Sequence, residues 1–308
     1  MRQGEITTSG KWTGPVGAGV TAPIPLVLPN AQRRFAATAT RLGAVATDHP
    51  AELWLRFMAQ LAWGQHEAVQ ALATTTPLRS SCIDQAIEGR IAPLGKDGVE
   101  LDRYWQPSLM RILDYLQDHV LPGEARAIMV DLRQQGEGEL SKLAHRFLND
   151  SLPANRIGHA FYVAAALQVH FTALAARLPA DTLRLLPERG LCPGCGSTPV
   201  AGVITATGRS PGCRYLHCSL CSTAWNHVRA VCVNCGGAGK LSLHCIDGHG
   251  LAKAETCDHC GTYSKLLYEQ DTPSLDPVAD DLSTLALDLM VGEAGWSRHA
   301  PNPLLLAL

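Results

Sequence analysis

Eight of the eleven cysteines in this 308-residue chain fall into four Cys-x-x-Cys pairs. A pair with this spacing lets two thiolates reach one metal ion from a single tight turn, and two such turns complete a tetrahedral site of four sulfurs. Eight thiolates therefore predict two closed metal sites per chain. The predicted ligands are Cys192 and Cys195, Cys218 and Cys221, Cys232 and Cys235, and Cys257 and Cys260.

The four pairs form a repeat. Cys192 precedes Cys232 by 40 residues, and Cys218 precedes Cys257 by 39. This pattern is typical of two tandem rubredoxin-like or zinc-ribbon modules, in which short strands join two cysteine turns. We expect sequential grouping, with the first four cysteines in one site and the last four in the other. An interleaved grouping, first pair with third and second with fourth, stays open at this point.

Glycines beside the pairs support the prediction of metal-binding turns. Gly194, Gly196, Gly236 and Gly261 stand where such a turn needs a positive φ or close backbone approach. Four disulfides would require an oxidising compartment. The remaining cysteines, Cys82, Cys213 and Cys245, have no counterpart in the repeat, so we leave them out of the ligand set.

Charge and hydropathy narrow the possible functions. The chain has a net charge of −2, and residues 191–270 carry 6 basic and 4 acidic groups. Nucleic-acid binding depends on several clustered cations, so this balance argues against it. No basic and apolar leader and no run of 18 apolar residues is apparent, so we expect no membrane insertion. Abundant cysteine without a signal sequence predicts a reducing cytoplasm.

The elements around the cysteines are predicted from periodicity and from turn residues. Glycines and prolines favour an extended arm at the N-terminus, and apolar residues at steps of three and four then predict helices. Short strands are predicted at 199–205, 214–217, 224–229, 241–245 and 262–268, and Asp276-Pro277 predicts the start of a last helix. The predicted boundaries are 1–30 for the arm, 31–187 for the helical domain, 188–230 and 231–270 for the two modules, and 271–308 for the C-terminal helix and tail.

These patterns predict an α+β protein. An N-terminal all-α helical bundle precedes two tandem rubredoxin-like or zinc-ribbon modules and a C-terminal helix. No nucleophile-elbow, phosphate-loop or dinucleotide motif occurs, so we expect a binding protein and name no catalytic residue. Tyr215, Trp225 and Tyr263 either anchor a partner or pack around the cysteine turns, and both interpretations stay open.

The motifs between residues 190 and 304 resemble the FdhE family of formate dehydrogenase accessory proteins. The resemblance lies in Cys-Pro-Gly-Cys-Gly-Ser from Cys192, Arg214-Tyr215-Leu216 before the second pair, Glu255-Thr256-Cys before the fourth, Asp276-Pro277 with Asp280-Asp281-Leu282, and Asn302-Pro303-Leu304. It implies a cytoplasmic factor that binds the catalytic subunit of a respiratory formate dehydrogenase before export. It also implies rubredoxin-like iron in the four pairs.

Iron and zinc both accept four thiolates in tetrahedral geometry. Spacing alone favours structural zinc, whereas the resemblance favours iron, so we expect two metal ions with iron preferred and zinc as the alternative. The competing functions are a nucleic-acid-binding ribbon protein and a thiol or electron-transfer oxidoreductase. Complete use of all eight sulfurs argues against a free catalytic dithiol. The oligomeric state is not predicted.

Overall fold

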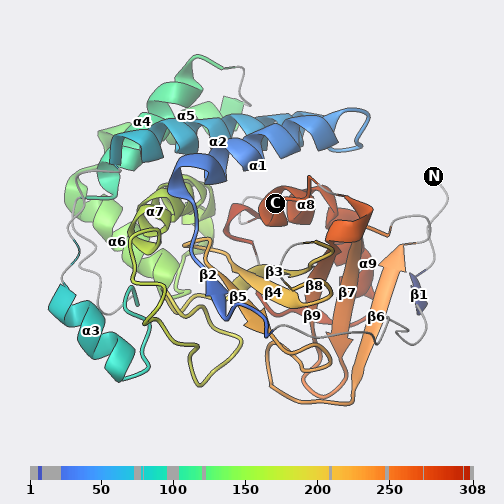
Figure 1. Ribbon diagram of the computed structural model, residues 1–308. Helices are drawn as coiled ribbons and strands as arrows, with labels where there is room; N and C mark the ends of the chain where they lie inside the picture. The colour runs from blue at the N-terminus through green and yellow to red at the C-terminus, as the bar shows by residue number, and fades with distance from the viewer. Residues whose placement is uncertain are drawn as a thin grey trace.

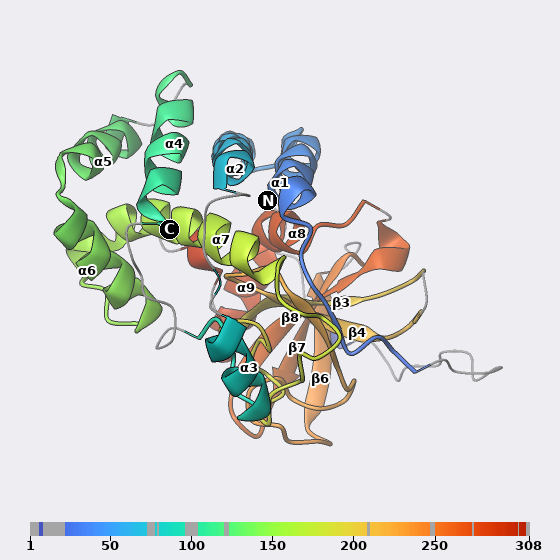
Figure 2. The same cartoon turned by 60° about the vertical axis from the view of Figure 1, so that its left-hand side comes forward.

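The computed structural model describes residues 6–8, 22–72, 78, 80–95, 104–119, 123–207, 210–246, 250–272, 274–300 and 302–305. Most helices of the N-terminal half lie on one side of a mixed sheet, and α8 (Pro277–Ser283) lies between α1 (Ala31–Ala46) and the sheet (Figures 1 and 2). The α+β class predicted from the sequence is confirmed, with the helical region first and both cysteine clusters in the sheet region. Most of the predicted arm, 1–30, lies outside the described residues.

The helical region is built on an apolar helix, α7 (Ile157–Ala175), whose residues from Ala160 onward are all buried. The segment Ala154–Ala175 is long and apolar enough to cross a membrane, since it contains an 18-residue window with a mean hydropathy of 1.3. It is 83% buried inside the fold, so its apolar surface serves the protein core. The other helices are α1 (Ala31–Ala46), α2 (Glu52–Leu72), α3 (Ser80–Glu88), α4 (Gln106–Gln117), α5 (Gly123–Gln134) and α6 (Glu137–Leu148).

The strands form one continuous sheet with the order β1-β6-β7-β8-β3-β4-β5-β2, and β9 (Ser297–Arg298) pairs with β8. The first module contributes β3 (Pro199–Ile204), β4 (Arg214–Cys218) and β5 (Ala224–His227), and the second contributes β6 (Leu241–Ile246), β7 (Ala252–Cys257) and β8 (Thr262–Tyr268). Each module is an antiparallel meander, as its short connections require. Strand β7 was not predicted from the sequence.

The two modules join through the parallel pairing of β3 with β8, in which Val203 lies opposite Leu267. A buried ion pair crosses the same boundary: Arg214 Nη1 lies 2.6 Å from Glu255 Oε1. Arg214 also donates to the carbonyl oxygen of Val231, 2.7 Å away, directly before the third cysteine turn. The modules therefore share one sheet and one set of polar contacts.

Both outer edges of the sheet are covered by short strands from the N-terminal arm. Strand β1 (Ile6–Thr8) pairs with β6, and β2 (Leu26–Val27) pairs with β5. Unpaired edge strands invite association with other chains, so this arrangement leaves fewer free backbone groups at the two ends of the sheet.

The C-terminal segment forms two short helices, α8 (Pro277–Ser283) and α9 (Leu285–Glu293), where the sequence predicted one. The break falls at Thr284, whose hydroxyl donates to the carbonyl oxygen of Asp280 at 2.7 Å. Lys265 from β8 also donates to the carbonyl oxygen of Asp281 at 2.9 Å. These contacts divert carbonyl oxygens from helical hydrogen bonding, so the helix ends and restarts.

Aspartates of α8 fasten the C-terminal segment to the helical region. Asp276 caps α8 by accepting from the amides of Val278 and Ala279, as its position before Pro277 predicts. Asp280 accepts a bidentate pair from Arg41 of α1, with the closest contact at 2.7 Å. Burial raises the pKa of the Asp280 carboxyl, although Arg41 opposes that shift.

Candidate metal centres

The four cysteine turns share one backbone geometry. In the first turn the amide of Gly196 donates to the carbonyl oxygen of Cys192 at 2.8 Å, and in the third Gly236 donates to Cys232 at 3.1 Å. The residue after each second cysteine has a positive φ, with Gly196 at 77°, Gly236 at 69° and Gly261 at 67°. A left-handed residue reverses the chain so that both sulfurs of a pair face one point.

Ser222 is the one residue of this set that is not glycine, and its φ is 61°. Its hydroxyl accepts a hydrogen bond from Nε of Arg34 at 2.8 Å. A side chain of α1 therefore contacts Ser222, whose backbone conformation is strained. Sequence reasoning missed Ser222, although the repeat offered a signal: serine stands where the other three turns have glycine.

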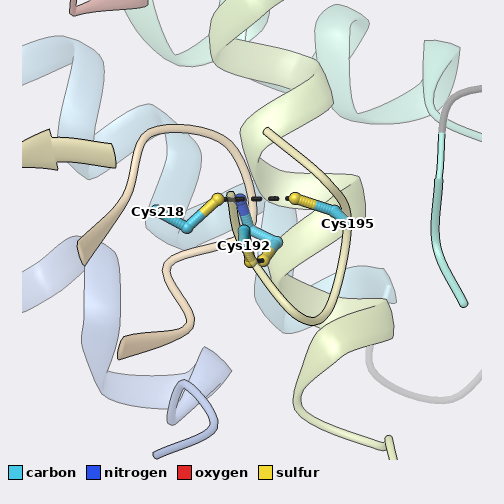
Figure 3. A group of neighbouring side chains, drawn as sticks. Cys192, Cys195 and Cys218 are labelled. Carbon is cyan, nitrogen blue, oxygen red and sulfur yellow. Dashed lines mark hydrogen bonds between the residues drawn. The ribbon is translucent and has the colours of Figure 1, made fainter. Parts of the chain in front are cut away.

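The first cluster, called site one below, contains Cys192, Cys195, Cys218 and Cys221. Its sulfurs lie within 4.8 Å of one another, with Cys192 and Cys221 3.5 Å apart and Cys195 and Cys218 3.4 Å apart. Cys195 and Cys218 point toward each other across the group (Figure 3). Metal–sulfur bonds of about 2.3 Å in a tetrahedron place sulfurs about 3.8 Å apart, so this arrangement fits one ion.

The second cluster, called site two below, contains Cys232, Cys235, Cys257 and Cys260. Cys232 and Cys260 have sulfurs 3.7 Å apart, and those of Cys235 and Cys257 are 3.8 Å apart, close to the same tetrahedral edge. Both clusters are therefore able to hold a metal ion. The structure forms the sequential grouping and not the interleaved one.

Polar groups lie beside the sulfurs in matching positions of the two sites. Thr223 Oγ1 lies 3.2 Å from Cys221 Sγ, and Thr262 Oγ1 lies 3.1 Å from Cys260 Sγ. Each threonine follows its cysteine by two residues. The amide of Cys221 also donates to Cys218 Sγ at 3.3 Å. Such donors orient metal-bound thiolates and reduce the electron density on sulfur.

The acidity of the thiols follows from burial and from the contacts between them. Burial raises the pKa of the Cys192 and Cys218 thiols well above the ordinary value. In site two burial raises the pKa of Cys232 to about 12. Burial opposes ionisation of Cys260 as well, but hydrogen bonds with Thr262, Cys232 and Cys257 together outweigh it and lower that pKa to about 7. A divalent or trivalent ion supplies the charge that deprotonates such thiols together.

The two sites differ sharply in exposure. Every cysteine of site one is buried, and they form part of the main hydrophobic core together with the helices. In site two Cys232 and Cys257 are buried, Cys260 is partly exposed and Cys235 is exposed. The sequence repeat treats the sites as equivalent, so this difference comes from their surroundings.

The other sequence predictions have mixed outcomes. Cys213 and Cys245 are partly exposed and join no ligand group among the described residues, while the side chain of Cys82 lies outside the described part. The suggestion that Tyr215, Trp225 and Tyr263 form a contact surface is wrong. All three are buried, and Trp225 Nε1 donates to the carbonyl oxygen of Arg189 at 2.9 Å. Tyr215 donates to the carbonyl oxygen of Ile24 and Tyr263 to Asp288 Oδ1, both at 2.9 Å, so all three side chains are used in contacts within the chain.

The fold and the clusters define an α+β protein with a helical domain and two four-cysteine ribbons in one sheet. Three family models match in order: FdhE N-terminal at residues 23–188, the FdhE central domain at 191–229 and the FdhE C-terminal domain at 230–305. The chain belongs to the FdhE family of formate dehydrogenase accessory proteins.

Full-length relatives agree with this assignment. The chain is 35% identical over 286 residues to the FdhE homologue of Proteus mirabilis, with 91% of each chain covered. It is 37% identical over 295 residues to that of Edwardsiella ictaluri, with 94% of each covered. The crystal structure of the FdhE protein from Pseudomonas aeruginosa superposes with a TM-score of 0.82 at 32% identity, covering 91% of this chain and 98% of that one.

Proposed function

We propose that this protein is a cytoplasmic accessory factor for the assembly of a respiratory formate dehydrogenase. It binds the catalytic subunit of that enzyme before export and acts as a binding protein without catalytic residues. Membership in the FdhE family along the whole chain is the observation that supports this function.

We further propose that the eight paired cysteines hold two metal ions, one in each site. The support is the agreement between the sulfur separations of 3.4–3.8 Å and the edge of a tetrahedral thiolate site. A closed site of this kind offers no free nucleophile, which argues against a thiol oxidoreductase.

Iron is the favoured ion, with zinc as the alternative. Ferric ion with four thiolates carries a charge of −1, whereas zinc leaves −2. Burial of charge costs free energy that rises steeply with its magnitude, and site one is buried on all four ligands. Its surroundings therefore suit the lower charge.

Two measurements test the proposal. Metal analysis of the purified chain should give two ions, with a red colour for ferric sites and none for zinc. Purified protein should also form a complex with the catalytic subunit of a formate dehydrogenase in size-exclusion chromatography, and an unrelated molybdoenzyme subunit serves as the control. One ion per chain would contradict the two-site proposal. Failure to capture the catalytic subunit would contradict the partner.

A further inference from the structure

We propose that the two clusters have different roles: site one permanently joins the helical region to the sheet, and site two exchanges its metal with thiolate or chelating nitrogen ligands outside the protein, through Cys235. This inference rests on the proposed occupancy of both sites. It gives the two sites different roles, although the sequence repeat gives them the same cysteine spacing.

Site one is held from several directions by the helical region. Gln168 of α7 is 2% exposed and donates to the carbonyl oxygen of Ser219, inside the second cysteine turn, at 2.8 Å. The amide of Leu94 donates to the carbonyl oxygen of Gly194, inside the first turn, at 2.9 Å. Arg34 of α1 holds Ser222. Opening site one would therefore break contacts with α1, α7 and the segment after α3.

A cavity of about 560 Å³ lies beside site one and includes Cys195 among its lining residues. Its wall also contains Phe147, Phe171 and Leu220, so it is largely apolar. Cys195 is nevertheless only 4% exposed. A ligand in this cavity could therefore reach only a small part of that residue.

Site two lacks such a cover on its outer side. Cys235 is exposed, and its neighbours Asn234 and Gly236 are exposed too. A Cβ built on Gly237 would lie 3.3 Å from Cys235 Sγ, closer than ordinary van der Waals contact, so the glycine leaves more room beside this sulfur. Nor does any hydroxyl or amide in the described part of the chain donate to Cys235 Sγ, whereas Cys260 contacts Thr262.

These differences identify the bond that exchanges. With an ion bound, an external thiolate or chelating nitrogen would take the place of Cys235 Sγ, and the released Cys235 thiolate would take a proton from water. The metal keeps its oxidation state throughout, and the ligand number returns to four. Site one would release its ion only when the helical region separates from the sheet.

The experiment uses the full chain loaded with two equivalents of Zn²⁺, which is redox-silent, and the chelator 4-(2-pyridylazo)resorcinol. We expect one equivalent to be released at least about tenfold faster than the other, a difference of about 1.4 kcal/mol in the barrier. Iodoacetamide added during the fast phase should modify Cys235 and Cys260. Cys192 and Cys221 should be modified only in the slow phase.

The matched variants are Cys235→Ser and Cys195→Ser, which remove the second cysteine of corresponding turns. Cys235→Ser should lose the fast equivalent and keep the slow one. Cys195→Ser should lose the cooperative thermal transition. Release of both ions at one rate, or modification of Cys195 in the fast phase, would overturn the division of roles. Fewer than two bound ions at the start would instead contradict the proposed occupancy, so the two failures are distinguishable.

Discussion

Replacing Lys265 tests whether a buried charge network holds the C-terminal helices on the sheet. The Lys265 ammonium is fully buried and lies 3.0 Å from Asp281 Oδ1 and 2.5 Å from Asp288 Oδ2. Arg298 contacts the same two carboxylates at 2.5 and 3.0 Å, so two cations balance two anions. Lys265→Met keeps most of the side-chain volume but leaves one carboxylate uncompensated.

The magnitude follows from the burial of these groups. Removing one member of a buried ion pair costs about 3–5 kcal/mol, because the remaining charge keeps its desolvation penalty. Arg298 retains contact with both carboxylates, so we expect the lower part of that range. Melting temperatures change by roughly 2–4 °C per kcal/mol in domains of 150–250 residues, which predicts a fall of about 10 °C.

The assay is urea denaturation of the single variants and of Lys265→Met combined with Asp288→Asn. The double variant restores neutrality, because Asp281 keeps Arg298 at 2.5 Å and accepts from Asn302 at 3.0 Å. We expect it to be more stable than the sum of the single changes predicts, by about 1–3 kcal/mol. Additive effects, or a loss below about 1 kcal/mol for Lys265→Met, would refute the electrostatic reasoning.

Three further predictions concern the helices and the segment between the two regions. Burial lowers the pKa of His170 to about 4. The His170 imidazole therefore takes up a proton at a higher pH in the unfolded chain than in the folded one, so the stability of the fold falls as pH drops from about 6.5 toward 4. Between pH 7 and 5, the free energy of unfolding measured in urea titrations should fall by about 2 kcal/mol less for His170→Leu than for the natural chain. Asp276→Ala removes the α8 cap and should cost about 1–2 kcal/mol in the same assay; no loss would contradict the capping role. Gly190→Ala would place a Cβ 2.1 Å from the carbonyl oxygen of Val233, so it should lower the free energy of unfolding by about 1–3 kcal/mol. The control is Gly138→Ala, whose Cβ meets no atom within 4 Å and which should be neutral or stabilising in thermal melts. Equal melting temperatures for the two glycine variants would show that the close approach at Gly190 is relaxed elsewhere.

The sequence by itself determined the local chemistry of the protein. A Cys-x-x-Cys turn brings two sulfurs together within four residues, so the four two-sulfur turns could be predicted from spacing and from the glycines at Gly196, Gly236 and Gly261, and the repeat favoured their sequential grouping. The cap at Asp276 and the long apolar helix around α7 were predictable for the same reason. Each depends on residues within a few positions of one another.

Only the tertiary structure decided how the modules sit and which cluster is covered. The parallel pairing of β3 with β8 joins residues more than 60 positions apart, and no turn between them signals it. The break at Thr284 depends on Lys265 arriving from a distant strand, and the burial of Trp225 depends on the packing of neighbouring elements. Two repeats with the same cysteine spacing thus become one buried and one accessible cluster, because burial is set by long-range packing and not by local sequence.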